Sequence, residues 1–380
     1  MRPRVLHVVE AIEGGVARHL VNLTTYVDAE HLVVLPPERV GGVTDIAAFG
    51  AMERAGARLE LLDMRRAPFD RRTVAAVPAL RRTIRGFDPD VVHGHSSIGG
   101  AVARIAAVGS RSARVYTPHG LFPSRVAYLT ERALGRFTDR LIAVSVSEAE
   151  LARRQRLVRP DRIVVIPNGI DVTEPPPASL NIRAALGFDA HAPLIGTVAR
   201  LVPQKAPEVF VDACRRVAAT RSDACFALVG DGPLASTTQA QVAASGIAER
   251  FLVLRDCPNG EALMSQFDVF VLSSRYEAGA TYAVMEAMRA ATPVVVTDVV
   301  GNTDAVEPGR SGFVVRPEDS EAIAEVVVQL VNNPSLRATV GQAGRARVAE
   351  RFDVRTTCAA LAELYRTLAS ERPRQTSHQL

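Results

Sequence analysis

Short apolar runs recur along the chain, with helical stretches between them. Runs rich in Val, Ile, Leu and Phe are typical of buried strands, and their alternation with helices is the pattern of βαβ units. In the first half of the chain the predicted strands are 5–9, 32–35, 59–62, 91–93, 115–117, 141–145 and 163–166. In the second half they are 194–198, 225–229, 251–254, 269–272, 294–297 and 313–315. The pattern therefore predicts an α/β protein with two parallel sheets.

A proline run separates the two series of strands. The segment Thr173-Glu174-Pro175-Pro176-Pro177-Ala178 can continue neither a central strand nor a helix, because proline lacks an amide hydrogen. At 380 residues the chain also exceeds the size at which a single core usually stops growing. We expect an N-terminal domain over residues 1–172, a linker over 173–192 and a C-terminal domain over 193–353. A last helix over 354–368 that packs back across the domains, and a disordered tail over 369–380, complete the prediction.

The composition is that of a soluble globular protein, with 47% hydrophobic and 23% charged residues. A formal net charge of +4 is small for this length, so it does not imply a nucleic-acid partner. Four widely spaced cysteines without a CxxC pair indicate reduced thiols and a cytoplasmic location. The first apolar run is too short for a signal peptide or a membrane span, so any membrane contact would be peripheral. No pattern in the sequence fixes an oligomeric state.

Positive charge is concentrated between Arg65 and Arg85, where arginines outnumber the single acid, Asp70. Most such clusters are a solvated helix face. The alternative is a docking surface for anionic lipid headgroups at the inner face of a membrane, or for an anionic acceptor. The sequence leaves both interpretations open.

Two glutamates flank a glycine-bearing turn after the predicted strand 269–272. Glu277 precedes the turn, Glu286 lies in a helix predicted over 281–291, and between them stand Gly279, Ala280 and Thr281. In a parallel sheet this loop lies at the carboxyl edge, where ligands bind and helix N-terminal amides attract anions such as a diphosphate. Carboxylates accept hydrogen bonds from hydroxyls, so the two glutamates fit a sugar and a ribose. A lone glutamate is more often simply solvated, but Glu286 has apolar neighbours on both sides and needs partners.

Two cations follow the first predicted strand of the second half. Arg200 and Lys205 flank the turn after strand 194–198, where they could hold a diphosphate without a metal ion. Gly230 and Asp231 begin a tight turn after the next strand. Each turn is a weak signal by itself, and a solvated basic pair is the alternative to a phosphate site. Their common place at one sheet edge favours a site for an anion.

Glycines and histidines mark the corresponding edge of the first predicted sheet. Gly15 follows the first strand in a Gly-Gly pair that lacks the third glycine of a dinucleotide fingerprint, and His19 lies in the next helix. His95 and His119 follow later strands. No acidic or Cys ligand stands beside these histidines at metal-ligand spacing, so no metal site is expected. His119, between a proline and a glycine, is the best functional candidate, whereas His19 is equally a packing residue.

Together these residues resemble glycosyltransferase family 4, whose members use nucleotide-diphosphate sugars and retain the configuration of the sugar. The resemblance extends over residues 4–368. It rests on Gly14-Gly15 with His19, Thr117-Pro118-His119-Gly120, Pro167-Asn168-Gly169-Ile170-Asp171, Arg200 with Lys205, Gly230-Asp231-Gly232-Pro233, and Glu277 with Glu286 followed by Pro293-Val294-Val295. It implies the GT-B fold, in which two Rossmann-like parallel-sheet domains face a central cleft. It also implies metal-independent, retaining transfer of a sugar to a hydroxyl of a bacterial polysaccharide, a lipid-linked glycan or a natural product.

The resemblance implies a role for each candidate residue. The catalytic residues would be His119, Arg200, Lys205 and Glu277, with both cations on the donor diphosphate. The donor would be bound by Gly15, Gly230, Asp231, Gly279, Ala280, Thr281 and Glu286, the last through the ribose. The acceptor side would hold His19, His95 and Asn168. No cofactor is implied beyond the nucleotide-sugar co-substrate, for which a UDP-sugar is the commonest choice in the family.

Three features depart from the family pattern. Glu277 and Glu286 have one more residue between them than is usual, and Ala206 replaces the glycine that commonly follows the lysine. The segment Gly301-Asn302-Thr303-Asp304 replaces a Gly-Gly-x-x-Glu sequence and resembles members that act on bacterial polysaccharides and lipid-linked glycans. The extra residue leaves the assignment of Glu277 to the sugar open.

Two other functions are compatible with these residues. A nucleotide-sugar epimerase of the same fold would need acid–base residues around the sugar, for which histidines such as His95 are candidates. A non-catalytic subunit would keep the nucleotide-sugar site without turnover. Transfer to an acceptor, proton exchange at a sugar carbon, and binding without turnover distinguish the three.

Overall fold

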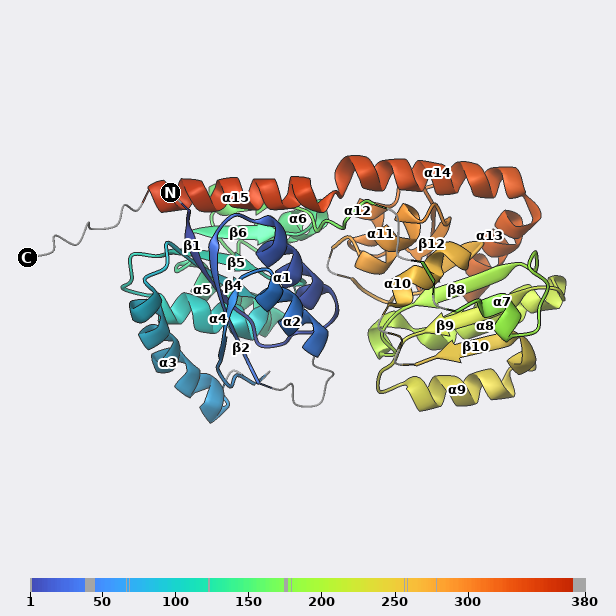
Figure 1. Ribbon diagram of the computed structural model, residues 1–380, viewed down its shortest axis with the longest axis horizontal. Coiled ribbons are helices and arrows are strands. Elements are labelled where there is room, and N and C mark those ends of the chain that lie inside the picture. Colours follow the sequence, from blue (N-terminus) through green and yellow to red (C-terminus); the bar gives the residue numbers. More distant parts are fainter. Residues whose placement is uncertain are drawn as a thin grey trace, which may run out of the picture. The chain divides into compact units, whose positions relative to one another are not determined.

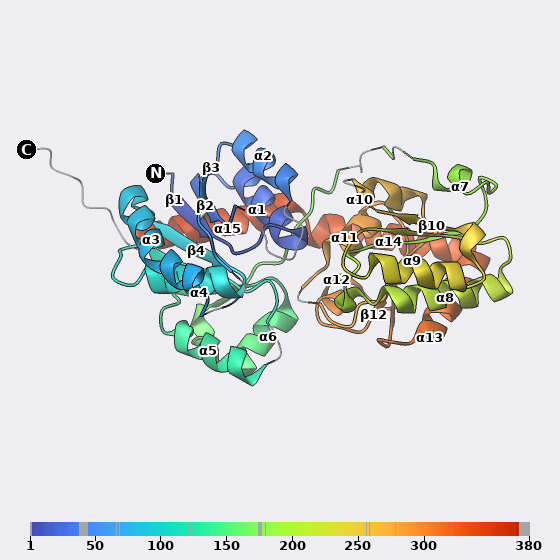
Figure 2. The ribbon, with the colours of Figure 1, turned by 90° about the horizontal axis from the view of Figure 1, so that it is seen from below.

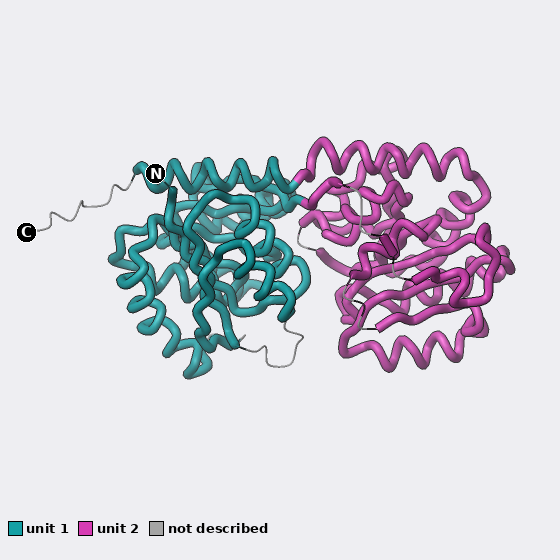
Figure 3. Tube along the Cα trace, in the orientation of Figure 1, with its two compact units in different colours: residues 1–169, 354–380 teal, residues 170–353 magenta. Residues whose placement is uncertain are grey.

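The computed structural model describes residues 2–37, 45–65, 67, 69–121, 124–173, 177–178, 180–255, 257, 259–277 and 279–371. The chain folds into two compact units, one of residues 1–169 and 354–380 and one of residues 170–353 (Figure 3). The second unit is continuous in sequence, whereas the first is completed by the C-terminal helix. Each unit is described by itself below.

The first unit is built on a seven-stranded sheet in which all described neighbours are parallel. Its strands are β1 (Arg4–Val8), β2 (Glu30–Leu35), β3 (Arg58–Leu61), β4 (Val91–His95), β5 (Ala113–Thr117), β6 (Arg140–Ala143) and β7 (Ile163–Val165). Their spatial order is β3-β2-β1-β4-β5-β6-β7. Every strand predicted for the first half is thereby confirmed.

Helices cover both faces of this sheet. They are α1 (Gly14–Tyr26), α2 (Ile46–Arg54), α3 (Arg71–Phe87), α4 (Ser97–Ala106), α5 (Arg125–Gly135), α6 (Val146–Arg154) and α15 (Val354–Ser370), with a 3-10 turn η1 (Pro160–Arg162). Helices α1, α2 and α15 share one core with the sheet, and α3 and α4 share another on the opposite face. Figure 2 shows the sheet between these two groups of helices. The unit is thus a three-layer α/β/α sandwich, the arrangement typical of Rossmann-like folds.

Alternation along β1 shows how the two faces differ. Val5 and Val9 pack under α1 and α15, whereas Leu6 and Val8 pack under α3 and α4. Because successive side chains of a strand point to opposite faces, His7 lies on the same face as Val5. That face therefore carries a buried histidine beside the apolar residues of its core.

The second unit repeats the plan with a six-stranded sheet, again parallel at every described pairing. Its strands are β8 (Leu194–Val198), β9 (Cys225–Val229), β10 (Phe251–Leu254), β11 (Val269–Leu272), β12 (Val294–Thr297) and β13 (Phe313–Val315). Their spatial order is β10-β9-β8-β11-β12-β13. The order reverses beside β8, which makes the carboxyl ends of β8, β9 and β11 a topological switch point, where ligands of such sheets bind.

The helices of the second unit also form two layers. They are α7 (Ile182–Ala185), α8 (Pro207–Thr220), α9 (Ala235–Ala244), α10 (Gly260–Leu263), α11 (Tyr282–Arg289), α12 (Asn302–Ala305), α13 (Ser320–Asn332) and α14 (Pro334–Arg351), with 3-10 turns η2 (Pro203–Lys205), η3 (Ala248–Arg250) and η4 (Met264–Gln266). Helices α8, α9 and α13 share one core, and α7, α10, α11 and α14 contribute to the other. Proline stands at the first position of α8 and α14, where the missing amide hydrogen costs nothing.

The structure can be compared with the predicted linker, last helix and C-terminal tail. Residues 182–185, assigned from the sequence to a linker, form α7 within the second unit. Helix α15, drawn in red in Figure 1, packs against α1 of the first unit. Residues 174–176 and 179 of the proline-rich segment, and residues 372–380 of the predicted tail, lie outside the described residues. Among the helices that the structure describes, none has the length and apolar character needed to cross a membrane.

Candidate active site

The turn after β8 places a cation at the carboxyl edge of the second sheet. The chain leaves β8 at Val198, passes Arg200 and turns through η2 to Lys205. Ala206 follows in the left-handed conformation, with φ 46° and ψ 56°, and α8 begins at the next residue. Left-handed backbone favours glycine, which explains physically why glycine is common at this position in the family. The Lys205 side chain is 11% exposed.

Lys205 forms an ion pair with Glu277, whose side chain is 7% exposed. The Glu277 carboxylate also accepts hydrogen bonds from Ser274 Oγ, at 2.5 Å, and from Gln204 Nε2, at 3.2 Å. A carboxylate surrounded by donors in this way is held in one orientation. Arg200 lies nearby in sequence and is exposed, and its guanidinium approaches Gln204 Oε1 at 3.5 Å. The structure thus brings together three of the four residues predicted to be catalytic.

Hydrogen bonds join the loop after β11 to the turn after β8. Ser273 Oγ donates to the carbonyl groups of Lys205 and Ala206, at 3.1 and 3.0 Å. The Arg275 amide donates to the carbonyl of Gln204 at 2.8 Å. The two loops are therefore joined by hydrogen bonds to the backbone, which hold Lys205 near Glu277 in addition to their charges.

A glycine turn after β9 completes this edge. Gly230 has φ 147°, and a Cβ atom there would lie 1.9 Å from the carbonyl oxygen of Ala199, so only glycine fits. The Asp231 carboxylate receives two hydrogen bonds from Arg255, at 3.0 and 3.2 Å. The carbonyl of Asp231 accepts from the Leu201 amide at 2.8 Å. Asp231 thus fixes the turn through its contacts within the protein.

The loop that contains the extra residue packs against the segment after β12. Gly301 has φ 89°, and a Cβ atom there would lie 2.1 Å from the carbonyl oxygen of Gly279. Thr281 Oγ1 approaches Asn302 Oδ1 at 3.2 Å, and Asn302 Nδ2 donates to the carbonyl of Thr297 at 3.1 Å. Gly301 and Asn302, which depart from the usual family sequence, therefore support the glycine loop.

Glu286 lies in α11 with only 7% of the residue exposed. It is surrounded in sequence by buried apolar residues, as the pattern indicated, and Ala280 before the helix is 2% exposed. Glu286 belongs to the same unit as Lys205 and Glu277. The predicted donor-binding residues of the second half thus all belong to the second unit, while Gly15 lies in the other unit.

The remaining predicted catalytic residue, His119, lies in the first unit in the turn after β5. Its backbone has φ 54°, an uncommon value for a residue with a side chain. Glu148 of α6 holds this turn by accepting hydrogen bonds from the amides of Gly120, at 2.9 Å, and Val144, at 2.8 Å. Ser145 caps the same helix by accepting from the Glu148 amide at 3.0 Å.

His19 and His95 lie close to His119. The His119 ring is 4.6 Å from the His19 ring and 5.4 Å from the His95 ring, centroid to centroid. Burial lowers the pKa of His19 to about 4, although the neighbouring Asn168 side chain raises it. The structure therefore brings all three predicted acceptor-side residues together with His119.

The histidine nitrogens satisfy the spacing of a metal site, which the sequence had not led us to expect. The sets His7, His93, His95 and His19, His95, His119 each offer three nitrogen atoms within 4.8 Å of one another. However, His93 is hydrogen-bonded on both nitrogens, to Tyr365 and to Thr117, each at 2.7 Å. In the structure described here, both His93 nitrogens thus serve as hydrogen-bond partners and are not left open for a metal ion.

Sequence reasoning missed three supporting residues. Gln204 and Ser274 orient Glu277; Gln204 adjoins Lys205, and Ser274 lies three positions before Glu277. Glu148 carries a recognisable signal, because Ser145-Val146-Ser147-Glu148 has the sequence of a capping box. The Ser145 side chain accepts from the Glu148 amide, while the Glu148 carboxylate accepts from the amide of Val144 instead of Ser145. A search for such boxes beside candidate turns would have found it.

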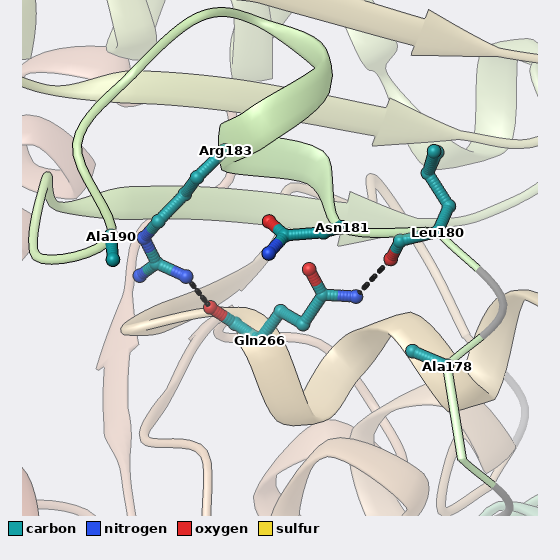
Figure 4. Close-up of a pocket in the computed structure, with 6 residues that line it drawn as sticks. All are labelled: Ala178, Leu180, Asn181, Arg183, Ala190 and Gln266. Atoms are coloured by element: carbon teal, nitrogen blue, oxygen red, sulfur yellow. Dashed lines mark hydrogen bonds between the residues drawn. The ribbon is translucent and has the colours of Figure 1, made fainter.

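A surface hollow of about 320 Å³ lies elsewhere in the second unit, between α7 and η4. It is lined by Ala178, Leu180, Asn181, Arg183, Ala190 and Gln266. Figure 4 shows Arg183 donating to the Gln266 carbonyl and Gln266 donating to the Leu180 carbonyl, at 2.8 and 2.6 Å. These bonds tie α7 and the residues before it to η4, and none of the predicted site residues lines the hollow.

Two Rossmann-like units, one with a buried lysine–glutamate pair and an arginine at its carboxyl edge, define a glycosyltransferase of GT-B type. The chain belongs to glycosyltransferase family 4. Its residues 13–174 match the family described as "Glycosyltransferase Family 4", and residues 179–347 match "Glycosyl transferases group 1". The family likeness stated from the sequence is therefore confirmed, and the protein is a glycosyltransferase that uses nucleotide sugars.

Two curated relatives and one solved structure illustrate the similarity. The chain is 31% identical to alpha-maltose-1-phosphate synthase of Mycolicibacterium smegmatis, over 74% of this chain and 79% of that one. It is 30% identical to UDP-Gal:alpha-D-GlcNAc-diphosphoundecaprenol alpha-1,3-galactosyltransferase of Escherichia coli, over 65% and 67%. HepE of Anabaena, solved with UDP-glucose, superposes with a TM-score of 0.81 at 22% identity, over 96% of this chain and 100% of that one.

Proposed function

We propose that the protein is a retaining, metal-independent glycosyltransferase that moves a sugar from a UDP-sugar to a hydroxyl acceptor of a polysaccharide or lipid-linked glycan. The observation that carries this proposal is the grouping of Arg200, Lys205 and Glu277 on joined loops at the switch point of the second sheet. Two relatives add support, since HepE was solved with UDP-glucose and the E. coli enzyme acts, by its name, on a diphosphoundecaprenol-linked sugar.

The two cations suit a diphosphate leaving group. As the glycosidic bond breaks, negative charge grows on the diphosphate, and fixed positive groups lower the energy of that state. Arg200 can bind a phosphate with two parallel hydrogen bonds, while Lys205 provides a compact point charge. We therefore assign both side chains to the diphosphate, the role that a metal ion has in other transferases.

Glu277 is better suited to orient a sugar than to attack it. Its carboxylate is paired with Lys205 and accepts hydrogen bonds from Ser274 and Gln204, and each of these contacts reduces its nucleophilicity. This supports a front-face reaction, in which the acceptor hydroxyl enters on the side of the leaving group and no covalent sugar intermediate forms. The configuration at the anomeric carbon is then retained.

The residues of the first unit have separate proposed roles. His119 would contact the reacting sugar, and His19, His95 and Asn168 would lie on the acceptor side. Gly15 would contact the donor from the first turn of α1. The arginines of α3 and of the preceding loop would hold the protein against anionic lipids at the inner face of a membrane.

The decisive experiment follows the anomeric configuration during transfer. The purified protein is incubated with UDP-sugars and lipid-linked or soluble acceptors, with and without EDTA, and the product is examined by proton NMR. We expect an unchanged anomeric configuration and the same rate in EDTA. An inverted product, or activity that EDTA abolishes and a divalent ion restores, would contradict the proposal. Solvent deuterium incorporation at a sugar carbon without an acceptor would indicate an epimerase instead.

A further inference from the structure

Four histidines of the first unit, three of them buried and one half-buried, are joined end to end by hydrogen bonds between their rings. His31 Nδ1 lies 3.0 Å from His7 Nε2, and His7 Nδ1 lies 3.1 Å from His95 Nε2. His95 Nδ1 lies in turn 3.1 Å from His119 Nε2. We call His31, His7, His95 and His119 the histidine chain. It crosses β2, β1 and β4 and ends in the turn after β5 that contains the proposed sugar-contacting residue.

The backbone carbonyl of Val27 fixes the direction of these hydrogen bonds. His31 Nε2 lies 3.0 Å from this oxygen, and a carbonyl only accepts, so His31 Nε2 carries a proton. A neutral imidazole has one ring proton, so His31 Nδ1 is an acceptor and His7 Nε2 must donate to it. Repeating this step places the protons of His7, His95 and His119 on Nε2. His119 Nδ1 is then unprotonated, and no residue that the structure describes forms a hydrogen bond with it.

The surroundings keep the four rings neutral. Burial lowers the pKa of His7, His31, His95 and His119, and the nearby rings of His19 and His93 lower several of them further. Among the described residues, Arg2 lowers and Asp28 raises the pKa of His31 at the far end of the histidine chain, both less than burial does. At the near end, the Glu148 carboxylate is engaged by the amides of Gly120 and Val144. His93 lies beside the histidine chain and forms hydrogen bonds with Thr117 and Tyr365.

We propose that His31, His7 and His95 are positioning residues that hold His119 in the tautomer with an unprotonated Nδ1, so that His119 accepts a hydrogen bond from a sugar hydroxyl. The ligand in this inference rests on the proposed function, whereas the tautomer rests on contacts within the first unit. A hydroxyl fits this nitrogen because it can donate. A phosphate or carbonyl oxygen does not fit, since it can only accept.

Nitrogen NMR of the full chain labelled with ¹⁵N-histidine tests the tautomer directly. At pH 7.5 we expect His119, His95, His7 and His31 to show a protonated Nε2 and an unprotonated Nδ1, with signals assigned by single His→Gln substitutions. A proton on Nδ1 of His119 would overturn the proposal. So would stoichiometric binding of added Zn²⁺ through His95 and His119, because the cluster would then be a metal site.

Substitution of His31, at the far end of the histidine chain, tests whether the direction of its hydrogen bonds determines the tautomer of His119. His31→Phe removes the bond to Val27, so His119 should become a mixture of both tautomers, and kcat/KM should fall by about tenfold or more. His31→Gln keeps an acceptor for His7 and a donor for Val27, and should restore the single tautomer. An unchanged His119 spectrum in a folded His31→Phe variant contradicts the proposal. If that variant does not fold, the wild-type spectrum decides.

The two proposals fail in different ways. Expected tautomers without transfer from any UDP-sugar would refute the proposed function and leave the histidine chain in place. Transfer with retention, together with a His119 tautomer that does not depend on His31, would refute only the present inference.

Discussion

A buried ion pair at the carboxyl edge of the second sheet couples two residues that are 72 positions apart, Lys205 and Glu277. Their side chains are 11% and 7% exposed, so each partner neutralises a charge that would otherwise be largely desolvated. Substituting either residue therefore changes the other as well. Arg200, by contrast, is exposed. Its substitution therefore removes a positive charge while the ion pair between Lys205 and Glu277 stays in place.

The cations at this edge are predicted to act on the leaving group. Arg200→Ala and Lys205→Ala should each reduce turnover by about a hundredfold or more, because a fixed charge on the developing diphosphate is lost. Initial rates at saturating donor measure the effect. Arg310→Ala, whose side chain is 74% exposed, is the control and should behave as wild type. Wild-type turnover in both Arg200→Ala and Lys205→Ala would disprove the assigned role.

Gly230 illustrates close approach of backbone at the same edge. Gly230→Ala should destabilise the protein by about 1–3 kcal/mol more than Gly246→Ala, as measured by urea unfolding. Both glycines have positive φ. A Cβ atom at Gly230 would lie 1.9 Å from the Ala199 carbonyl oxygen, whereas a Cβ atom at Gly246 would have no described heavy atom within 4 Å. Equal losses of stability would show that backbone strain alone, without the clash, explains the effect.

Among the elements, α6 does more than cover the sheet. Its capping glutamate, Glu148, reaches out of the helix to the turn that contains His119, and thereby couples the start of a helix to a candidate site residue. The Ser145 cap and the buried position of Glu148, which is 1% exposed, make this contact rigid.

Removal of this carboxylate should therefore destabilise the first unit. Glu148→Ala leaves the buried amide of Val144 and the amide of Gly120 without an acceptor, which should lower the free energy of unfolding by about 1–3 kcal/mol. Urea titration followed by circular dichroism measures this. Glu150→Ala, on the exposed face of α6, is the matched control and should change stability by less than about 0.5 kcal/mol. A similar small effect for Glu148→Ala would refute the coupling.

Helix α3 presents a basic face, with Arg71, Arg82 and Arg85 exposed. Two other arginines of the predicted cluster are engaged, since Arg65 and Arg72 each pair with Asp63 at 3.1 Å. Arg66 lies outside the described residues. The membrane-docking interpretation thus depends on fewer cations than the sequence suggested.

Vesicle binding tests the basic face. The protein should bind vesicles that contain anionic phosphatidylglycerol at low salt, and salt should weaken the binding because exposed charges are screened. The double substitution Arg82→Glu with Arg85→Glu should abolish co-sedimentation. Arg310→Glu with Arg366→Glu makes the same change in net charge elsewhere and should have little effect. Absence of binding by the wild type at low salt would remove the membrane contact from the proposal.

For the whole molecule, the histidines of the first unit make stability depend on pH. Burial lowers the pKa of His7, His19, His31, His93, His95 and His119 below 6.5, the value expected in the unfolded chain. The unfolded chain therefore binds more protons below pH 6.5. Stability is fully present above that pH and is lost as the pH falls towards the pKa values of the folded state, which for His19 is about 4.

Acid should consequently unfold the protein at unusually mild pH. Each of these histidines removes up to about 1.4 kcal/mol of stability per pH unit below 6.5, so the urea midpoint should fall steeply between pH 6.5 and pH 5. His19→Gln should reduce this slope by about one proton, whereas His191→Gln, at an exposed position in the second unit, should not. A midpoint that stays constant over this range would contradict the prediction.

The sequence by itself determined the two parallel sheets, the thirteen strands found among the described residues, and the family. These follow from local patterns, because the period of apolar residues and the position of glycine and proline act over a few neighbouring residues. For the same reason the individual turns that contain Arg200, Lys205, Gly230, Glu277 and His119 could be recognised.

Only the tertiary structure decided which of these residues meet. The pairing of Lys205 with Glu277, the clamp of Glu148 on the His119 turn and the histidine chain all join residues far apart in sequence. The sequence did not single out His31 or His7, because nothing local distinguishes a histidine that packs alone from one that forms hydrogen bonds to other rings. Such contacts depend on strand order and register, and these are fixed by the packing of the entire core.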